Sequence, residues 1–120
     1  MIFRKIKKSF SYAFEGFKFF VKERNIKIHF GAALLAILLG IIFGITLIEW
    51  VAVVISISLV ISLEILNTVT EDLIDLLYHE RNGKVMIIKD LSAAAVFIAA
   101  LGSFIVGLLI FTPYILRNLQ

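Results

Sequence analysis

The chain has 120 residues, of which 61% are hydrophobic, with a mean hydropathy of +1.02 and a formal net charge of +3. These values lie well outside the range of soluble globular proteins, so the lipid bilayer is the first solvent to consider. The sequence contains no cysteine, which excludes disulfides, thiol catalysis and metal sites built on cysteine.

Residues 1–27 combine basic charge with regularly spaced apolar side chains. The apolar residues recur at intervals of three and four, which places them on one stripe of a helix. They are Phe3, Ile6, Phe10, Phe14, Phe17 and Val21, and the opposite side holds Arg4, Lys5, Lys8, Glu15, Lys18 and Lys22. Such an amphipathic helix is predicted to lie on the membrane surface, with its lysines against anionic headgroups. The periodicity leaves open whether it is only an anchor or also contributes to a site.

Three long apolar segments follow, and we predict that they form membrane-spanning helices over residues 28–48, 50–77 and 90–116. A hydrocarbon core of roughly 30 Å takes about 20 helical residues to cross, and each segment provides them. The second helix continues past its apolar part, and Asn82-Gly83 marks the break before the third. The sequence therefore predicts an all-α integral membrane protein with a single domain over residues 1–120.

Basic residues are distributed unevenly about these spans. Eight precede the first span, three lie between the second and the third, and Arg117 alone follows the last. Because cytoplasmic loops carry an excess of Lys and Arg, we predict a cytoplasmic N-terminus and a C-terminus outside. The expected location is the inner (plasma) membrane, as a multi-pass protein.

The second span carries four polar side chains that we call the polar row: Glu64, Asn67, Glu71 and Asp75. Steps of three, four and four residues at 100° each place them on one face, whereas Asp72 points elsewhere and is interpreted as a surface charge. A carboxylate within the hydrocarbon costs on the order of 3 kcal/mol, so the row is expected to face protein or water. The alternative is a polar helix contact at the membrane edge with no further role.

The residue types of the polar row suit phosphoryl-transfer chemistry. Carboxylates and an amide offer oxygen ligands, which Mg²⁺ prefers to softer ligands. Phosphoryl transfer uses one carboxylate to hold the metal against phosphate oxygens and another to accept the proton of the attacking hydroxyl. Lys89 is placed to meet phosphate charge, whereas His29 and His79 show no metal-binding spacing and are interpreted as interfacial residues. P-loop and protein-kinase motifs are absent, which excludes those two designs.

Three sequence blocks occur in order around the three spans. The first is Glu23-Arg-Asn-Ile-Lys-Ile-His29, the second runs from Glu64 through Asn67-Thr68 and Glu71 to Asp75, and the third is Lys89-Asp90 followed by Ala-Ala-Ala-Val96. Together they resemble the small prokaryotic membrane lipid kinases, a family that comprises bacterial diacylglycerol kinase and the Gram-positive enzymes that phosphorylate undecaprenol. The resemblance covers nearly the whole chain.

This resemblance implies transfer of a phosphoryl group from Mg-ATP to a lipid hydroxyl at the cytoplasmic membrane face. It implies that Glu64 is the general base and that Glu23 and Glu71 hold Mg²⁺. Positions near the nucleotide and its phosphates match Asn67, Asp75, Lys89 and Asp90. Lys5 aligns approximately with a basic residue that assists the substrate, and Ser92 is small enough to leave room for a lipid chain.

The expected partners are ATP, a lipid alcohol, the membrane and further copies of the chain, with no nucleic acid. A homo-oligomer is expected because one chain with three spans cannot shield the whole polar row from lipid, and the resemblance implies a homotrimer whose sites are shared between chains. Undecaprenol is favoured narrowly as the acceptor, with diacylglycerol as the alternative. Outside the enzyme class, a proton- or ion-conducting oligomer and a structural membrane subunit remain open.

Overall fold

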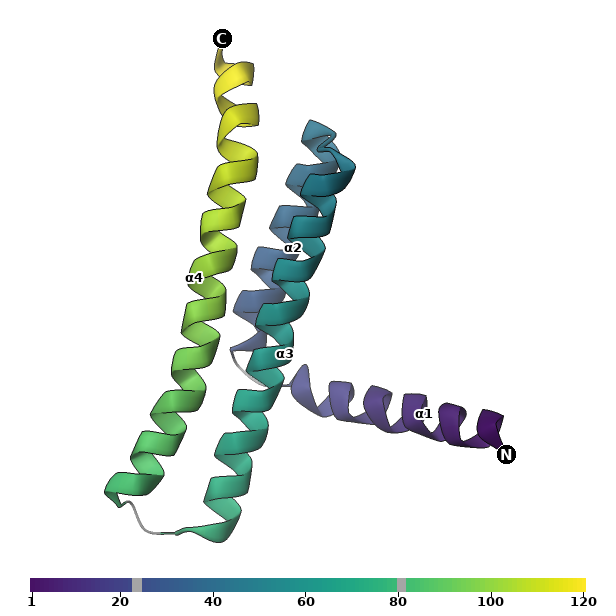
Figure 1. The fold of residues 1–120 in the computed structure, drawn as a ribbon, viewed down its shortest axis with the longest axis vertical. Coiled ribbons are helices and arrows are strands. Elements are labelled where there is room, and N and C mark those ends of the chain that lie inside the picture. The colour runs from purple at the N-terminus through teal and green to yellow at the C-terminus, as the bar shows by residue number, and fades with distance from the viewer. Residues whose placement is uncertain (23–24, 80–81) are drawn as a thin grey trace.

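The computed structural model describes residues 1–22, 25–79 and 82–120. Within these residues the chain forms four α-helices, which Figure 1 shows in order along the chain. They are α1 (Ile2–Phe20), α2 (Ile26–Phe43), α3 (Leu47–Leu77) and α4 (Gly83–Leu119). The helices α2, α3 and α4 pack side by side, whereas α1 leads away from them (Figure 1). The predicted all-α architecture is therefore confirmed.

The turn between α2 and α3 is defined by a glycine and a threonine. Gly44 has a φ of 61°, in the left-handed region that favours glycine, and it ends α2 at Phe43 rather than at the predicted residue 48. Thr46 then begins α3 through a capping box with Glu49. The Thr46 Oγ1 accepts a hydrogen bond from the Glu49 N–H at 3.2 Å, and the Glu49 Oε1 accepts one from the Thr46 N–H at 3.0 Å.

Aromatic and aliphatic side chains close the bundle beside this turn, at what we call the Trp50 end (residues 40–53 and 106–117). The ring of Trp50 lies against Gly40, where an added Cβ would meet the Trp50 Cη2 atom at 2.7 Å. Phe43 stacks on Tyr114 with ring centroids 5.8 Å apart. Around them lies a buried core of Ile45, Val53, Ile110 and Phe111. Side chains from all three packed helices therefore hold this end together.

At the opposite end, which we call the Glu71 end (residues 67–79 and 82–92), α3 and α4 continue past the start of α2 (Figure 1). At about 1.5 Å per residue, α3 is roughly 46 Å long and α2 roughly 27 Å. The helix α4 begins at Gly83 rather than at the predicted residue 90, because the Asn82 Oδ1 accepts a hydrogen bond from the Val85 N–H at 2.9 Å and caps an earlier first turn. The adjacent ends of α3 and α4 thus project beyond the three-helix region.

Three helices of the described residues, α2, α3 and α4, are long and apolar enough to cross a membrane. Many of their large apolar side chains are exposed, including Ile42 and Phe97 at 72% and 69%. Exposed apolar surface on this scale marks contact with lipid or with another protein. The chain is therefore an integral membrane protein, as predicted.

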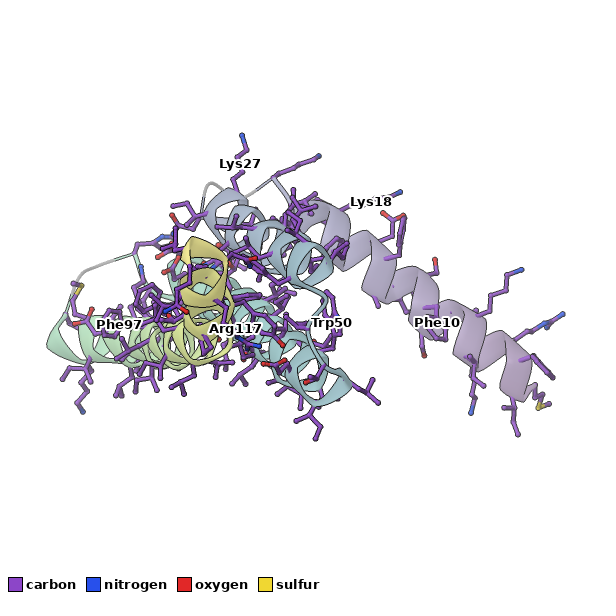
Figure 2. The ribbon with its side chains drawn as sticks, turned by 90° about the horizontal axis from the view of Figure 1, so that it is seen from above. Phe10, Lys18, Lys27, Trp50, Phe97 and Arg117 are labelled. Carbon is purple, nitrogen blue, oxygen red and sulfur yellow. The ribbon has the colours of Figure 1, made fainter. Side chains whose placement is uncertain are left out.

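The helix α1 contacts the bundle near its C-terminal end. Phe17 packs edge-on against Phe30 of α2, with ring centroids 5.9 Å apart, and Phe20 is buried. Most other phenylalanines and all lysines of α1 are exposed. Figure 2, which looks along the long axis of the bundle, shows Phe10 and Lys18 on the part of α1 that extends to one side, with Phe97 of α4 on the far side of the bundle.

Candidate functional site

The polar row lies on α3 as its spacing predicts, and its burial falls steadily along the helix. Glu64 and Asn67 are buried, at 6% and 8% exposure, whereas Glu71 and Asp75 are exposed. Between Glu64 and Asp75 the helix rises by about 16 Å, so the row leads from the apolar part of the bundle to its Glu71 end. One chain therefore shields the deeper half of the row by itself, which limits the argument for an oligomer to Glu71 and Asp75.

Glu64 meets a histidine from another helix. The His29 Nε2 lies 3.3 Å from the Glu64 Oε2, and the His29 side chain is 19% exposed. His29 stands in the first turn of α2, at the level where that helix reaches Glu64. Its interpretation as an interfacial residue was therefore incomplete, because a contact between helices that are distant in sequence leaves no trace in the spacing within either helix.

Asn67 and Glu71 form the next contact along the row. The Asn67 Nδ2 donates a hydrogen bond to the Glu71 Oε1 at 3.2 Å. The other end of the same amide, Asn67 Oδ1, is buried and accepts no hydrogen bond from the described residues. Because buried acceptors are nearly always satisfied, this oxygen is available to a ligand of the site. Carboxylate and amide oxygens are a donor set that fits Mg²⁺.

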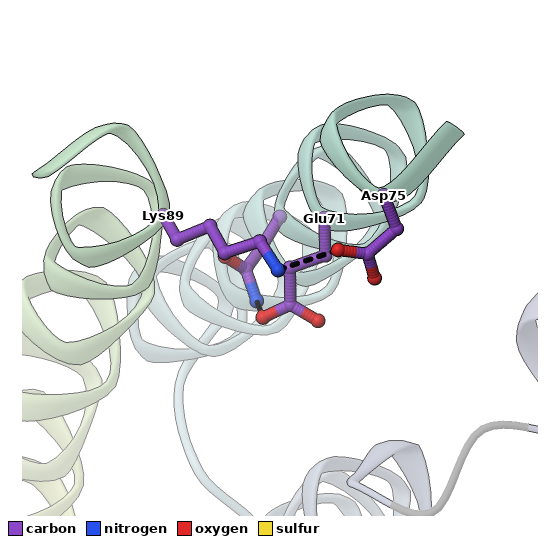
Figure 3. A network of polar contacts seen from close by, with 4 residues as sticks. Glu71, Asp75 and Lys89 are labelled. Atoms are coloured by element: carbon purple, nitrogen blue, oxygen red, sulfur yellow. Dashed lines mark hydrogen bonds and ion pairs between the residues drawn. The ribbon is translucent and has the colours of Figure 1, made fainter. Parts of the chain in front are cut away.

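Asp75 pairs with a cation from α4. The Lys89 Nζ lies 2.6 Å from the Asp75 Oδ1, and Figure 3 shows Lys89 reaching from α4 to α3, where Glu71 and Asp75 lie on one side of the helix. The side chains of Lys89 and Asp75 are 31% and 64% exposed. A partly exposed ammonium that pairs with Asp75, one helical turn from Glu71, is suited to binding an anion together with a metal ion.

The other residues predicted for the site lie farther from this cluster. Asp90 is exposed on α4 directly after Lys89, and Ser92 is half-buried on the same helix. Lys5 is exposed near the N-terminus of α1, at the end of that helix that lies farthest from the spans (Figure 1). Within one chain, Lys5 is therefore not brought to the polar row. Glu23 lies outside the described residues.

Within residues 1–22, 25–79 and 82–120, no three His, Cys, Asp or Glu side chains are close enough together to hold a metal ion. The predicted metal ligands Glu23 and Glu71 are not tested by this finding, since Glu23 is outside those ranges. What the described residues bring together is a pair of side chains with oxygen ligands, Glu71 and Asn67.

An open groove of about 500 Å³ runs along the bundle between α2, α3 and α4. It extends from His29 at one end to Phe111 at the other, and its lining is almost entirely apolar. Along α2, from His29 to Leu39, this distance is about 15 Å. The groove therefore connects the apolar interior of the membrane region with the residue that contacts Glu64.

Comparison with known proteins gives a family match and two relatives. The sequence pattern of prokaryotic diacylglycerol kinase matches residues 11–111. An undecaprenol kinase of Bacillus subtilis is 37% identical over 91 residues, which cover 76% of this chain and 74% of that protein. A diacylglycerol kinase of Synechocystis is 34% identical over 113 residues, which cover 90% of this chain and 63% of that protein. The matched region includes the whole polar row and Lys89.

Proposed function

Because the chain belongs to the prokaryotic diacylglycerol kinase family, we propose that it is an ATP-dependent kinase whose acceptor is the lipid alcohol undecaprenol. Undecaprenol is preferred since the relative of that name has the higher identity and shares the larger part of its own length with this chain. Diacylglycerol is the second candidate, supported by the family description and the Synechocystis relative. The structural observation that carries the proposal is the polar row, which leads from a buried carboxylate to an exposed, cation-paired one.

Glu64 is assigned as the general base. It is the deepest carboxylate of the row, so a lipid hydroxyl anchored near the headgroups can approach it while the lipid chain stays in the membrane. In the reaction, the hydroxyl proton passes to Glu64 as the hydroxyl oxygen bonds to the γ-phosphorus. The bond between that phosphorus and the bridging oxygen breaks, and ADP leaves with the electron pair.

Mg²⁺ is proposed as the metal ion that accompanies ATP. Glu71 and the free Oδ1 of Asn67 would hold it, together with Glu23, whose part rests on the family resemblance. Bound there, the ion would neutralise charge on the phosphate oxygens. Lys89 would meet the phosphates as a point charge, and its contact with Asp75 holds its ammonium at the same end of the polar row as Glu71. Asp90 is assigned to the nucleotide side as well.

The lipid chain is proposed to lie in the apolar groove. The groove ends at His29, which places an apolar chain within reach of Glu64 at its hydroxyl end. Ser92 is assigned to the substrate because it is small and half-buried on α4. The helix α1 is proposed to lie on the membrane surface with its phenylalanines in the acyl boundary, and Lys5 would then act at that surface on substrate of the same or a neighbouring chain.

A homotrimer in the inner membrane is proposed, with residues 1–120 acting as one domain, the N-terminus in the cytoplasm and the C-terminus outside. The exposure of Glu71 and Asp75, which one chain leaves unshielded, supports a site completed by another chain. The Glu64→Gln and Glu23→Gln chains should each be inactive alone, and mixed oligomers that contain both should recover part of the activity. Well-folded mixtures that stay inactive would show that each site is built within one chain.

The proposed function is tested with purified protein in detergent micelles, supplied with Mg-ATP and with either undecaprenol or diacylglycerol. We expect lipid phosphate to form in step with ADP, with a higher kcat/KM for undecaprenol. A reaction without lipid measures background ATP hydrolysis. A higher kcat/KM for diacylglycerol would reverse the choice of acceptor, and phosphorylation of neither lipid would overturn the proposed function.

A further inference from the structure

The contact between His29 and Glu64 joins two helices at a buried point. The two side-chain atoms are 3.3 Å apart, and only 8% of the Glu64 side chain is exposed. Within the described part of the chain, His29 is the basic residue that lies at ion-pair distance from Glu64. Lys89 pairs instead with Asp75, about three turns farther along α3. His29 has no role in the proposed binding of phosphate.

We propose that His29 is a positioning residue for the general base, an inference that rests on the proposed kinase function. A carboxylate surrounded by apolar side chains is poorly solvated, and a facing N–H group stabilises its charged, proton-accepting form. The Nε2 of the imidazole lies within ion-pair distance of one oxygen of Glu64, Oε2, and a small rotation of the ring would let an N–H group there donate to it. The second oxygen, Oε1, is then left to accept the proton of the lipid hydroxyl.

The location of His29 makes this role specific to the acceptor side of the reaction. His29 lines the end of the apolar groove, so it fixes the Glu64 carboxylate where the hydroxyl of a lipid in that groove would arrive. The residues assigned to Mg-ATP, Glu71 and Lys89, lie toward the other end of the row. Loss of His29 should therefore slow the chemical step and leave the affinity for Mg-ATP unchanged.

Side-chain geometry supplies matched variants. The amide nitrogen of glutamine occupies nearly the place of the histidine Nε2, whereas that of asparagine is closer to the place of Nδ1 and falls short of Glu64. His29→Leu and His29→Asn should lower kcat by about 10- to 100-fold, as loss of residues that orient reactive groups commonly does. His29→Gln should recover at least half of this loss, measured as log kcat. In all of these variants the KM for Mg-ATP should stay within about twofold of wild type. His79→Leu, the same change at an exposed histidine, is the control.

The experiment measures kcat and both KM values for these variants in the wild-type and Glu64→Gln backgrounds, with thermal unfolding in the same detergent. If His29 acts through Glu64, His29→Asn should have no further effect on the residual kcat of Glu64→Gln. Should His29→Leu fail to fold, the comparison of Gln with Asn decides the matter. Equal kcat for Gln and Asn, or equal loss in both backgrounds, would overturn the proposal. A wild-type protein that phosphorylates no lipid would instead overturn the proposed function.

Discussion

The two ends of the helix bundle differ in whether their polar side chains have hydrogen-bond partners within the chain. At the Trp50 end, Glu49 accepts hydrogen bonds from the Thr46 backbone and from the Tyr114 hydroxyl, and Arg117 lies over the Tyr114 ring at 4.9 Å. At the Glu71 end, the buried oxygen of Asn67 accepts no hydrogen bond from a described residue. The first arrangement is complete within the chain, whereas the second has capacity for a ligand.

From this difference we expect the Trp50 end to determine the stability of the bundle and the Glu71 end to determine the catalytic rate. The Trp50 end has the buried aromatic core and the capping box, and α2 packs there against both other spans. At the Glu71 end α3 and α4 project past α2, and the contacts between them include an exposed ion pair, a kind that contributes about 0–1 kcal/mol. Substitutions at the Trp50 end should therefore lower thermal stability, and substitutions in the polar row should lower the rate.

After the general base Glu64 itself, the largest effect is expected for Glu71→Gln. The change removes the negative charge that would hold Mg²⁺ and leaves a side chain of the same shape, so kcat should fall by about 10² to 10³-fold without a change in thermal unfolding. The measurement is a Mg²⁺ titration of lipid phosphorylation. Asp72→Asn, which neutralises the next residue on another face of α3, is the control and should stay near wild type. Full activity in excess chelator would refute the metal assignment.

Gly40→Ala should show the reverse pattern. The new Cβ would lie 2.7 Å from the Trp50 Cη2 and 3.1 Å from the Ile45 Cδ1, so the packing at the Trp50 end must shift at a cost of about 1–3 kcal/mol. Gly31→Ala, on the same helix but with no atom within 4 Å of its added Cβ, is the control. The midpoint temperature of thermal unfolding in detergent should fall for Gly40→Ala alone, and the kcat of the folded protein should be retained. Equal melting of the two variants would contradict the packing described here.

Gly107→Leu tests whether the groove takes the lipid chain. Gly107 lines the groove and has open space at its Cβ position, so a leucine there would fill part of the volume. We expect KM for the lipid to rise about tenfold, with KM for Mg-ATP unchanged. Gly102→Leu adds the same side chain to α4 at a position that also has open space but is not part of the groove lining. If both variants raise the lipid KM equally, the chain binds elsewhere.

Thr46→Ala should give the smallest effect, again confined to stability. It removes the oxygen that accepts the Glu49 N–H hydrogen bond and should cost about 1 kcal/mol. Thr70→Ala is the comparison, since the Thr70 hydroxyl only donates to the Leu66 carbonyl within α3. Thermal unfolding should separate the two variants. A larger loss for Thr70→Ala would mean that the cap contributes little at this end.

The features that depend on local spacing could be predicted from the sequence. The three spans follow from their length and apolar content, and the polar row follows from the 100° rotation per residue, which also explains why Asp72 points away from the row. The sequence predicts the end of α2 too late because apolar residues continue past Gly44, and only the left-handed backbone at that glycine shows where the helix stops. Hydropathy does not register such a change of backbone conformation.

Contacts between distant segments were beyond prediction for a related reason. The pairing of His29 with Glu64 and of Lys89 with Asp75 depends on how far α2 and α4 are shifted along α3, which no periodicity within one helix determines. The same holds for the packing of Trp50 on Gly40 across the turn. The position of Lys5, near the far end of α1, likewise depends on the angle at which that helix leaves the bundle.

The central claim, that the polar row performs phosphoryl transfer with Glu64 as the base, is tested most directly by a single-turnover measurement. Enzyme saturated with lipid is mixed with limiting Mg-ATP, and the rate of lipid phosphate formation is compared for wild type, Glu64→Gln and Glu49→Gln. We predict that Glu64→Gln slows this step by about 10² to 10⁴-fold with normal ATP binding and unfolding, and that Glu49→Gln keeps the wild-type rate. A Glu64→Gln rate near wild type, with only a raised KM for lipid, would contradict the account and make Glu64 a substrate-binding residue.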